Sequence, residues 1–267
     1  MFNRLTDDAK EMIHEQVAFR ELLMQMTRRD LMLRYKQTVM GFGWAVFMPL
    51  LNTLIFSVMF TRVAKLDVGM PYPLFAYCGL LTWNLFASSL RFALTSLTAN
   101  TSLVTKVYFP REIFPFSAVF VSVVDLAVGA TLLVGMMAYY RVGVTSALWF
   151  LPVVLVVHIA FTAGMALLLA MWNLFYRDVK YLFEVVLMLW MFASPVVYPV
   201  HMIDGTLGIL LQLNPMTPII DAYRAVLLHG RLPEPGPFAA AAALSLLTLS
   251  YGWMSFHRAE FEFAENV

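Results

Sequence analysis

Six stretches of the sequence are apolar and almost free of charged residues. A helix needs about 20 mainly apolar residues to cross the hydrocarbon core of a bilayer. Stretches of this kind predict membrane spans over residues 39–60, 68–90 (with the helix beginning near Tyr72), 113–140, 147–172, 185–203 and 237–256. We therefore predict an all-α membrane protein with six transmembrane helices, in which residues 1–267 form a single domain.

A charged segment, residues 8–33, precedes the first span. Its apolar side chains follow helical spacing among acidic and basic neighbours, and they are Met12, Phe19, Leu22, Leu23 and Met26. This pattern is typical of an amphipathic helix that lies flat on the membrane surface. A cytoplasmic helix packed against a partner protein has the same pattern, so both interpretations stay open.

The connection between the fifth and sixth spans contains a second unusual segment. Residues 205–220 are apolar, but four residues interrupt them: Gly208, Asn214, Pro215 and Pro218. An interrupted apolar segment that is too short to cross predicts a re-entrant hairpin, which membranes tolerate where protein buries it. The alternative is an ordinary external loop that rests on the membrane.

Composition indicates that most of the surface faces lipid. Hydrophobic residues make up 61% of the chain and charged residues 13%, and the mean hydropathy is +0.74. A soluble domain carries about 25% charged residues. The net charge of +1 gives no reason to expect a nucleic-acid partner, and a single cysteine, Cys78, excludes an intrachain disulfide or a cysteine-based metal cluster.

Lysine and arginine are distributed unequally between the two sides of the predicted spans. Thirteen of the 18 lie in the N-terminal segment, in the loops after the second and fourth spans, and in the C-terminal tail. Cytoplasmic loops carry the excess of basic residues. We therefore predict that both termini lie in the cytoplasm.

Several catalytic motifs are absent from the sequence. No Gly precedes a Lys, so the chain has no phosphate-binding G-x-x-x-x-G-K-[ST] loop, and it has neither an H-E-x-x-H nor a G-x-S-x-G motif. We expect no catalytic residue, cofactor or metal site in this chain, and we expect any ATP-driven work to be done by another chain. Motif-poor membrane transferases remain an alternative.

Polar and aromatic residues inside the spans are candidates for a transport path. Asp125 lies about midway along the third span, where a carboxylate costs roughly 2.5–3.5 kcal/mol on insertion scales. We favour a buried Asp that bonds a neighbouring helix over a polar element of a translocation path. Trp44 and Phe47 either belong to the interfacial aromatic belt or line a passage for a sliding polymer.

The order of several motifs closely resembles the permease subunits of ABC exporters for cell-surface polysaccharides, which include O-antigen, capsule and teichoic-acid exporters. The resemblance runs over about residues 25–225. It rests on these segments: RDLMLRYKQTVMGFGWAVFMPL (29–50), GLLTWNLFASSL (79–90), RFALTSLTANTSLVTKVYFPREIFPFSAV (91–119), NLFYRDVKYLFEV (173–185), SPVVYP (194–199) and NPMTPIIDAYR (214–224).

This resemblance implies an assembly and a location. We expect a homodimer in the bacterial inner membrane, paired with two copies of a separate ATPase that binds ATP and Mg²⁺, and a lipid-linked polysaccharide of the undecaprenyl diphosphate type as substrate. It also implies short re-entrant helices over residues 204–232 that close the external side. The residues carried over to that external gate are Asn214, Pro215 and Tyr223.

The resemblance also implies contacts with the ATPase. A short basic and aromatic segment can insert into a pocket of a partner protein. The residues carried over to ATPase coupling are Lys106, Tyr108, Phe109, Pro110, Arg111, Glu112, Arg177 and Asp178. For the loop of Arg177 and Asp178, simple anchoring by its basic residues is the alternative.

Arg34, Tyr35 and Lys36 form a candidate substrate entrance, because they lie where the charged segment meets the first span. Arg and Lys at headgroup level suit the two phosphates of an isoprenoid diphosphate. The alternative is that these residues only anchor the first span. An ABC permease for a drug or lipid, or a membrane-embedded glycosyl- or acyltransferase, are the competing functions.

Overall fold

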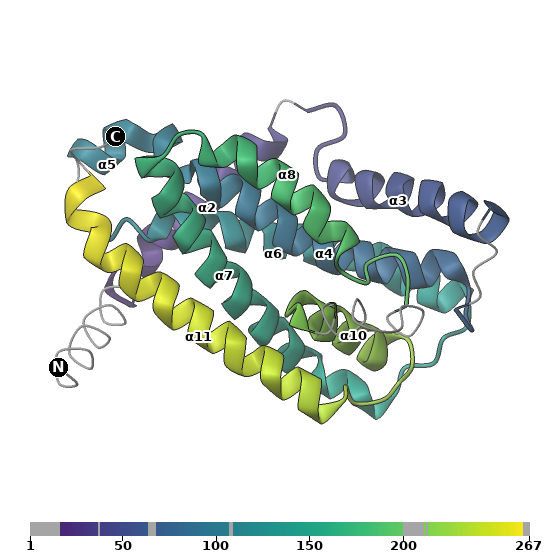
Figure 1. The fold of residues 1–267 in the computed structure, drawn as a ribbon. Coiled ribbons are helices and arrows are strands. Elements are labelled where there is room, and N and C mark those ends of the chain that lie inside the picture. The colour runs from purple at the N-terminus through teal and green to yellow at the C-terminus, as the bar shows by residue number, and fades with distance from the viewer. Residues whose placement is uncertain are drawn as a thin grey trace.

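The computed structural model describes residues 17–36, 38–63, 68–106, 109–199, 211 and 213–263. Within these residues the regular elements are helices and there is no strand, which confirms the predicted all-α class. The α-helices are α2 (Arg20–Tyr35), α3 (Gly43–Val58), α4 (Tyr72–Ser96), α5 (Thr101–Lys106), α6 (Ile113–Tyr139), α7 (Leu151–Phe175), α8 (Val179–Phe192), α10 (Met216–Leu227) and α11 (Pro235–Ala259). Figure 1 shows α5 at one end of the bundle and α10 toward the other, and we call these the α5 end and the α10 end.

Four segments are long and apolar enough to cross a membrane by length and composition. They are Gly43–Arg62, Ile113–Tyr139, Ser146–Phe175 and Pro235–Glu262. They correspond to the first, third, fourth and sixth predicted spans.

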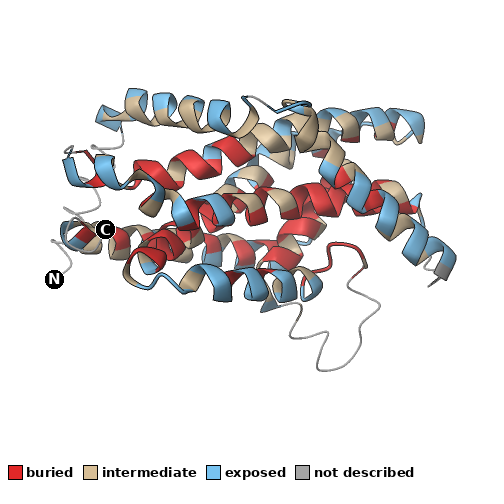
Figure 2. Ribbon diagram, turned by 90° about the horizontal axis from the view of Figure 1, so that it is seen from above, coloured by how far each residue is buried: buried red, intermediate tan, exposed pale blue. Residues whose placement is uncertain are grey.

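The second predicted span is α4, which begins at Tyr72 as expected but lies inside the protein. It packs against α3, α6, α7, α8 and α10, and most of its residues are buried. Figure 2 shows the buried residues gathered in the central helices and the exposed ones on the outer helices. Because other helices surround α4, it can bury polar residues such as Thr82 and Ser89 inside the protein.

The fifth predicted span, 185–203, is wrong in its bounds. The helix α8 begins earlier, at Val179, and ends at Phe192, and the chain then continues through a largely buried, non-helical segment, Ser194–Pro199. Pro195 explains the end of the helix, because a proline disfavours the helical conformation of the residue before it. The 14 residues of α8 span about 21 Å, which is less than the hydrocarbon thickness of about 30 Å.

Two hydrophobic clusters hold the helices together. The larger one joins α4, α6, α7 and α10. The second lies at the α5 end, and its side chains include Leu97, Val104, Phe109, Phe256 and Phe263, with residues of α2 packed against them. The start of α2 and the end of α11 therefore meet at the same end of the bundle.

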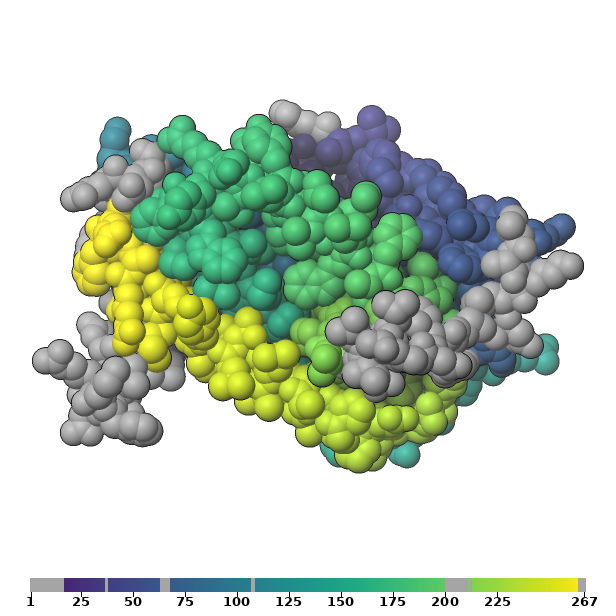
Figure 3. All heavy atoms as spheres, viewed as in Figure 1, coloured from purple at the N-terminus to yellow at the C-terminus, as the bar shows by residue number. Residues whose placement is uncertain are grey.

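The outer helices expose large apolar side chains. Figure 3 shows α11 along one edge of the molecule and α3 at the opposite edge, with α8 between them on the same face. Leu54 and Ile55 of α3 are about three-fifths exposed, and so are Met188 and Leu189 of α8. Lipid or another protein must cover these surfaces.

Candidate functional site

The helix before the first span is attached to the third span by a partly buried polar cluster. Arg34 of α2 forms an ion pair with Asp125 of α6, and the Tyr35 hydroxyl donates a 2.5 Å hydrogen bond to the other oxygen of the Asp125 carboxylate. The Arg34 guanidinium also lies 3.6 Å from the centre of the Phe92 ring. Burial and the bond to Asp125 raise the pKa of Tyr35, so its hydroxyl remains a donor. The structure thus places Asp125 in a contact between helices.

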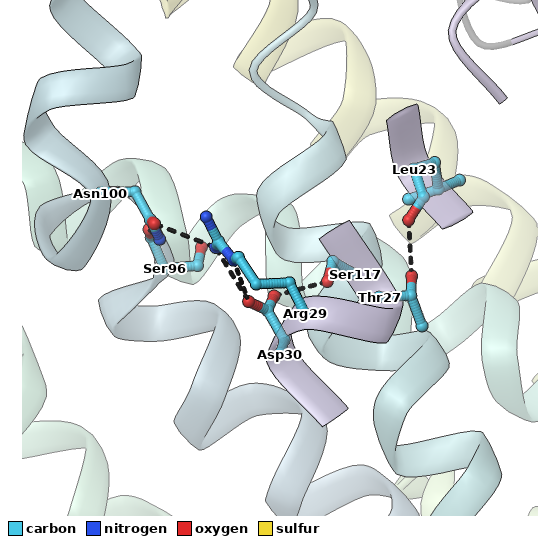
Figure 4. Close-up of polar contacts among 7 residues, drawn as sticks. All are labelled: Leu23, Thr27, Arg29, Asp30, Ser96, Asn100 and Ser117. Carbon is cyan, nitrogen blue, oxygen red and sulfur yellow. Dashed lines mark hydrogen bonds and ion pairs between the residues drawn. The ribbon is translucent and has the colours of Figure 1, made fainter. Parts of the chain in front are cut away.

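A second polar cluster joins α2 to α6 and to Asn100, which lies just after the end of α4 (Figure 4). Arg29 donates to Asp30 at 2.8 Å and to the side chain of Asn100 at 3.0 Å. Ser117 of α6 donates to the other oxygen of Asp30 at 2.6 Å. From Ser117 to Asp125 the contacts advance about two turns along α6, so α2 runs obliquely along that helix.

A cavity of about 330 Å³ lies between these two clusters. Its lining includes Arg29, Asp30, Arg34, Phe92 and Asn100. Small-molecule sites begin at about 300 Å³ and combine apolar walls with a few polar groups. The cavity has the size and lining of a site for a compact polar group.

The predicted entrance residues are only partly brought together. Arg34 and Tyr35 both bond Asp125, whereas Lys36 is exposed. Gly41 follows in a left-handed conformation, with φ of 53°, and has no atom within 4 Å of the position of a Cβ. It therefore serves the bend between α2 and α3.

Trp44 and Phe47 lie half-buried on α3 with their rings edge to face, 5.7 Å apart. The helix α3 contacts α4 and α6 along one side. That these two aromatics line a passage stays a prediction.

The coupling loop is the first of the two predicted coupling elements and comprises residues 106–112. Most of its described residues face the interior of the protein. Phe109 is packed in the cluster at the α5 end, and Pro110 and Glu112 are buried with it. Lys106, the last residue of α5, is exposed. Tyr108 lies outside the described residues. A contact of this loop with an ATPase stays a prediction, and Lys106 is the loop residue that offers an exposed charge for it.

Arg111 connects the coupling loop to the end of α11. Its backbone N–H donates to the Glu260 carboxylate at 2.8 Å, and its guanidinium donates to the backbone oxygen of Glu260. No local pattern indicates this contact, because 149 positions separate the two residues. The residue before Glu112 and α6 is therefore bonded directly to the end of α11.

The second predicted coupling element is the turn between α7 and α8. Arg177 and Asp178 are both exposed there, and Asp178 precedes the first residue of α8. In the part of the chain that the structure describes, no ion pair involves either residue. Both side chains are accessible to a partner, and their docking role stays a prediction.

At the α10 end, Asn214 joins the end of α8 to the start of α10. Its side-chain amide donates to the backbone oxygen of Ala193 at 2.9 Å and to the Ser194 hydroxyl at 2.8 Å. Its carbonyl oxygen accepts hydrogen bonds from Trp190 and from the backbone of Met216. Pro215, partly exposed, is the residue before α10.

Tyr223, the third predicted gate residue, is buried inside the bundle. It is 4% exposed, and its hydroxyl lies 3.4 Å from Nδ1 of His158 in α7. It therefore joins α10 to α7. Whether Asn214, Pro215 and Tyr223 act as a gate stays a prediction.

Arg224 is a structural residue that was not among the predicted site residues. Its side chain is 3% exposed, and it donates to the backbone oxygens of Pro195 at 2.7 Å and Val196 at 2.6 Å. Gly79 of α4 makes room for this arrangement, because a Cβ there would lie 2.1 Å from the Val196 oxygen. A recognisable signal was Asp221 three residues earlier on the same face of α10, which forms an ion pair with Arg224 at 3.6 Å.

The similarity to known proteins extends over residues from both ends of the bundle. The family model described as ABC-2 type transporter matches residues 21–228, from α2 through α10. A protein named "O-antigen export system permease protein RfbA" from Myxococcus xanthus is 30% identical to this chain over 258 residues, which are 96% of this chain and 99% of the relative. Two proteins of the same name from Klebsiella pneumoniae are 28% and 30% identical, over 92% and 79% of this chain and 94% and 82% of their own lengths.

Proposed function

The chain belongs to the ABC-2 type transporter family, and on that premise we propose that it is the membrane subunit of an ATP-driven exporter that carries a lipid-linked polysaccharide of the O-antigen kind across the bacterial inner membrane. The observation that carries this proposal is the similarity to an O-antigen export permease from end to end of both chains. Because the sequence has no phosphate-binding loop, ATP and Mg²⁺ bind to a separate ATPase subunit.

Six segments cross the membrane in this proposal. Four of them are the long apolar helices. The other two are α4 in the centre, and α8 together with the buried segment Ser194–Pro199. The meeting of α2 with the end of α11 at the α5 end supports an even number of crossings. With the excess of basic residues on that side, both termini lie in the cytoplasm. The described part of residues 204–232, chiefly α10, is the re-entrant element that closes the external side.

The working unit is a homodimer with two ATPase subunits. The exposed apolar faces of α3 and α8 support an interface between two copies, since both flank α4 and neither is covered in the single chain. Cys78 is buried, so a cysteine introduced at Leu54 or Met188 would be the only accessible thiol among the described residues. Crosslinking in membranes at either position supports this interface, and monomers at both positions contradict it.

The substrate diphosphate binds beside Arg34, in the cavity between α2, α4 and α6. Arg29 and Arg34 both line this cavity. Arg34 is already paired with Asp125, so a phosphate has to exchange with this carboxylate to obtain the guanidinium. Such an exchange would loosen the attachment of α2 to α6 at the moment of substrate binding.

ATP-driven movement passes through the α5 end of the protein. The coupling loop, α2 and the end of α11 share the hydrophobic cluster there, so a displacement of any of them moves the others. Lys106 and the pair Arg177 and Asp178 are the exposed charged positions that an ATPase contacts. The sugar chain then passes outward along α3, with Trp44 and Phe47 as sliding surfaces.

Reconstitution with the partner ATPase tests the function. In liposomes that contain both subunits, ATP hydrolysis should be stimulated by an undecaprenyl diphosphate-linked glycan and not by hydrophobic drugs or phospholipid. Stimulation by the drugs or phospholipid alone would favour a drug or lipid exporter. Modification of the lipid-linked sugar by this chain without an ATPase would favour a transferase.

A further inference from the structure

Three titratable side chains from two distant parts of the sequence converge at the α5 end. Nδ1 of His257, in the last turn of α11, lies 3.4 Å from Oε1 of Glu112 and 3.8 Å from Oε2 of Glu260. All three ligand atoms lie within 4.8 Å of one another. His257 and Glu260 are three positions apart and so share a face of the chain at the end of α11, while Glu112 precedes α6.

The environment of Glu112 is unfavourable for an isolated carboxylate. Its side chain is 1% exposed, and its buried Oε2 atom has no hydrogen-bond partner among the described residues. In the part of the chain that the structure describes, His257 is the one basic side chain within 4.0 Å of this carboxylate. A buried charged oxygen without a partner is strongly destabilising unless a cation or a donor satisfies it.

The separations within the cluster are compatible with a shared ion. Nδ1 of His257 forms a long hydrogen bond of 3.4 Å with Oε1 of Glu112 and lies 3.8 Å from Oε2 of Glu260. Ligands bound tetrahedrally to Zn²⁺ at about 2.0–2.1 Å are separated by about 3.4 Å. One imidazole nitrogen and two carboxylate oxygens are ligands that Zn²⁺ accepts.

Neighbouring contacts hold one of the three ligands, Glu260, in place. The other oxygen of the Glu260 carboxylate accepts the backbone N–H of Arg111 at 2.8 Å, which leaves Oε2 directed toward His257. The Arg111 guanidinium is occupied by the backbone oxygen of Glu260. Partners of this kind orient metal ligands in established sites.

We propose that Glu112, His257 and Glu260 bind a divalent transition-metal ion, with Zn²⁺ the ion that this donor set suits. The site joins the residue before α6 to the end of α11. It differs from our expectation from the sequence that the chain has no metal site. That expectation rested on the absence of a local motif, and Glu112 and His257 are 145 positions apart. The proposal does not depend on the transported substrate.

Metal titration of the purified full-length chain tests the site. After treatment with EDTA, ZnCl₂ is added in calorimetry and CoCl₂ in absorption spectroscopy, with His257→Gln, Glu112→Gln and Glu260→Gln as variants. His229→Gln is the control, because His229 is exposed at the α10 end and away from the cluster. We expect one Zn²⁺ per chain, a loss of affinity of at least roughly 100-fold in the three variants, and no change in the control.

The cobalt spectrum provides a second measurement on the unaltered chain. Tetrahedral Co²⁺ with nitrogen and oxygen ligands should give visible bands without thiolate charge transfer, since Cys78, the single thiol, is buried elsewhere in α4. No saturable binding to the unaltered chain would overturn the proposal. So would equal affinity of the unaltered chain and of a folded His257→Gln or Glu260→Gln variant, because binding would then be adventitious.

Discussion

Asp125 in the middle of α6 forms an ion pair with Arg34 at the end of α2, although 91 positions separate the two residues. The pair is largely buried, with 19% of the Asp125 side chain and 13% of the Arg34 side chain exposed. One contact thus satisfies the carboxylate that the third span carries and fixes the helix that precedes the first span.

Replacing Asp125 by Ala should lower the stability of the protein. Arg34 would lose its partner in a largely buried position, and breaking such a pair costs about 3 kcal/mol, the low end of the usual range because both side chains keep some exposure. Thermal unfolding in detergent measures the effect. Glu184→Ala is the control: it breaks the exposed Arg91–Glu184 pair, 3.1 Å long, which should change stability by less than about 1 kcal/mol. Equal losses of stability in the two variants would mean that the largely buried pair stabilises the protein no more than the exposed pair does.

Replacing Asp125 by Asn should strengthen the binding of a lipid-linked diphosphate. The amide keeps the shape of the side chain but removes the negative charge that competes for Arg34. A unit charge at about 4 Å contributes about 1 kcal/mol even in water, which corresponds to an affinity increase of about fivefold. Binding of a fluorescent undecaprenyl diphosphate to the protein in nanodiscs measures it. An unchanged affinity in Asp125→Asn, together with normal binding by Arg34→Ala, would remove Arg34 from the proposed entrance.

Charge reversal in the coupling loop should have different results at two positions. Lys106 is exposed, so Lys106→Glu should reduce stimulation of the partner ATPase without lowering the unfolding temperature. Arg111 is bonded to Glu260 beside Glu112, so Arg111→Glu should lower both, because like charges then meet in a partly buried place. ATPase assays and thermal unfolding of the same preparations separate the two effects. Full stimulation by Lys106→Glu would remove this residue from the coupling contact.

Gly79 should not tolerate a side chain. A Cβ at this position would lie 2.1 Å from the backbone oxygen of Val196 and 2.5 Å from Nη2 of Arg224, so Gly79→Ala should displace the segment that Arg224 holds. Overpacking of this kind costs about 1–3 kcal/mol. Hydrogen exchange over residues 194–199 should rise. The matched control is Gly135→Ala in α6, where a Cβ meets nothing within 4 Å. The stability of this control variant should stay the same or increase slightly, since Ala favours the helix. A similar loss of stability in both variants would contradict the proposed close contact of Gly79 with Val196 and Arg224.

Much of the architecture could be predicted from residue patterns. In lipid, the backbone N–H and C=O groups of an uncharged stretch of about 20 residues must bond one another, which requires a helix. This requirement alone located the spans that contain α3, α6, α7 and α11. The start of α4 at Tyr72 followed from the turn-forming residues before it. The bounds of α8 could not be placed in the same way, because apolar composition continues past Phe192 although Pro195 ends the helix.

The sequence by itself therefore determined which segments are apolar, where most of the long helices lie, and to which family the motifs belong, since these properties depend on neighbouring residues. Only the tertiary structure decided which polar groups are paired. Arg34 with Asp125, Arg224 with the carbonyls of Pro195 and Val196, and Glu112 with His257 are all joined across many positions of sequence. Inside an apolar bundle an unpaired charge is costly, so each charged group pairs with a polar group that helix packing brings near it. These pairs join residues far apart in the sequence, and no local pattern predicts them.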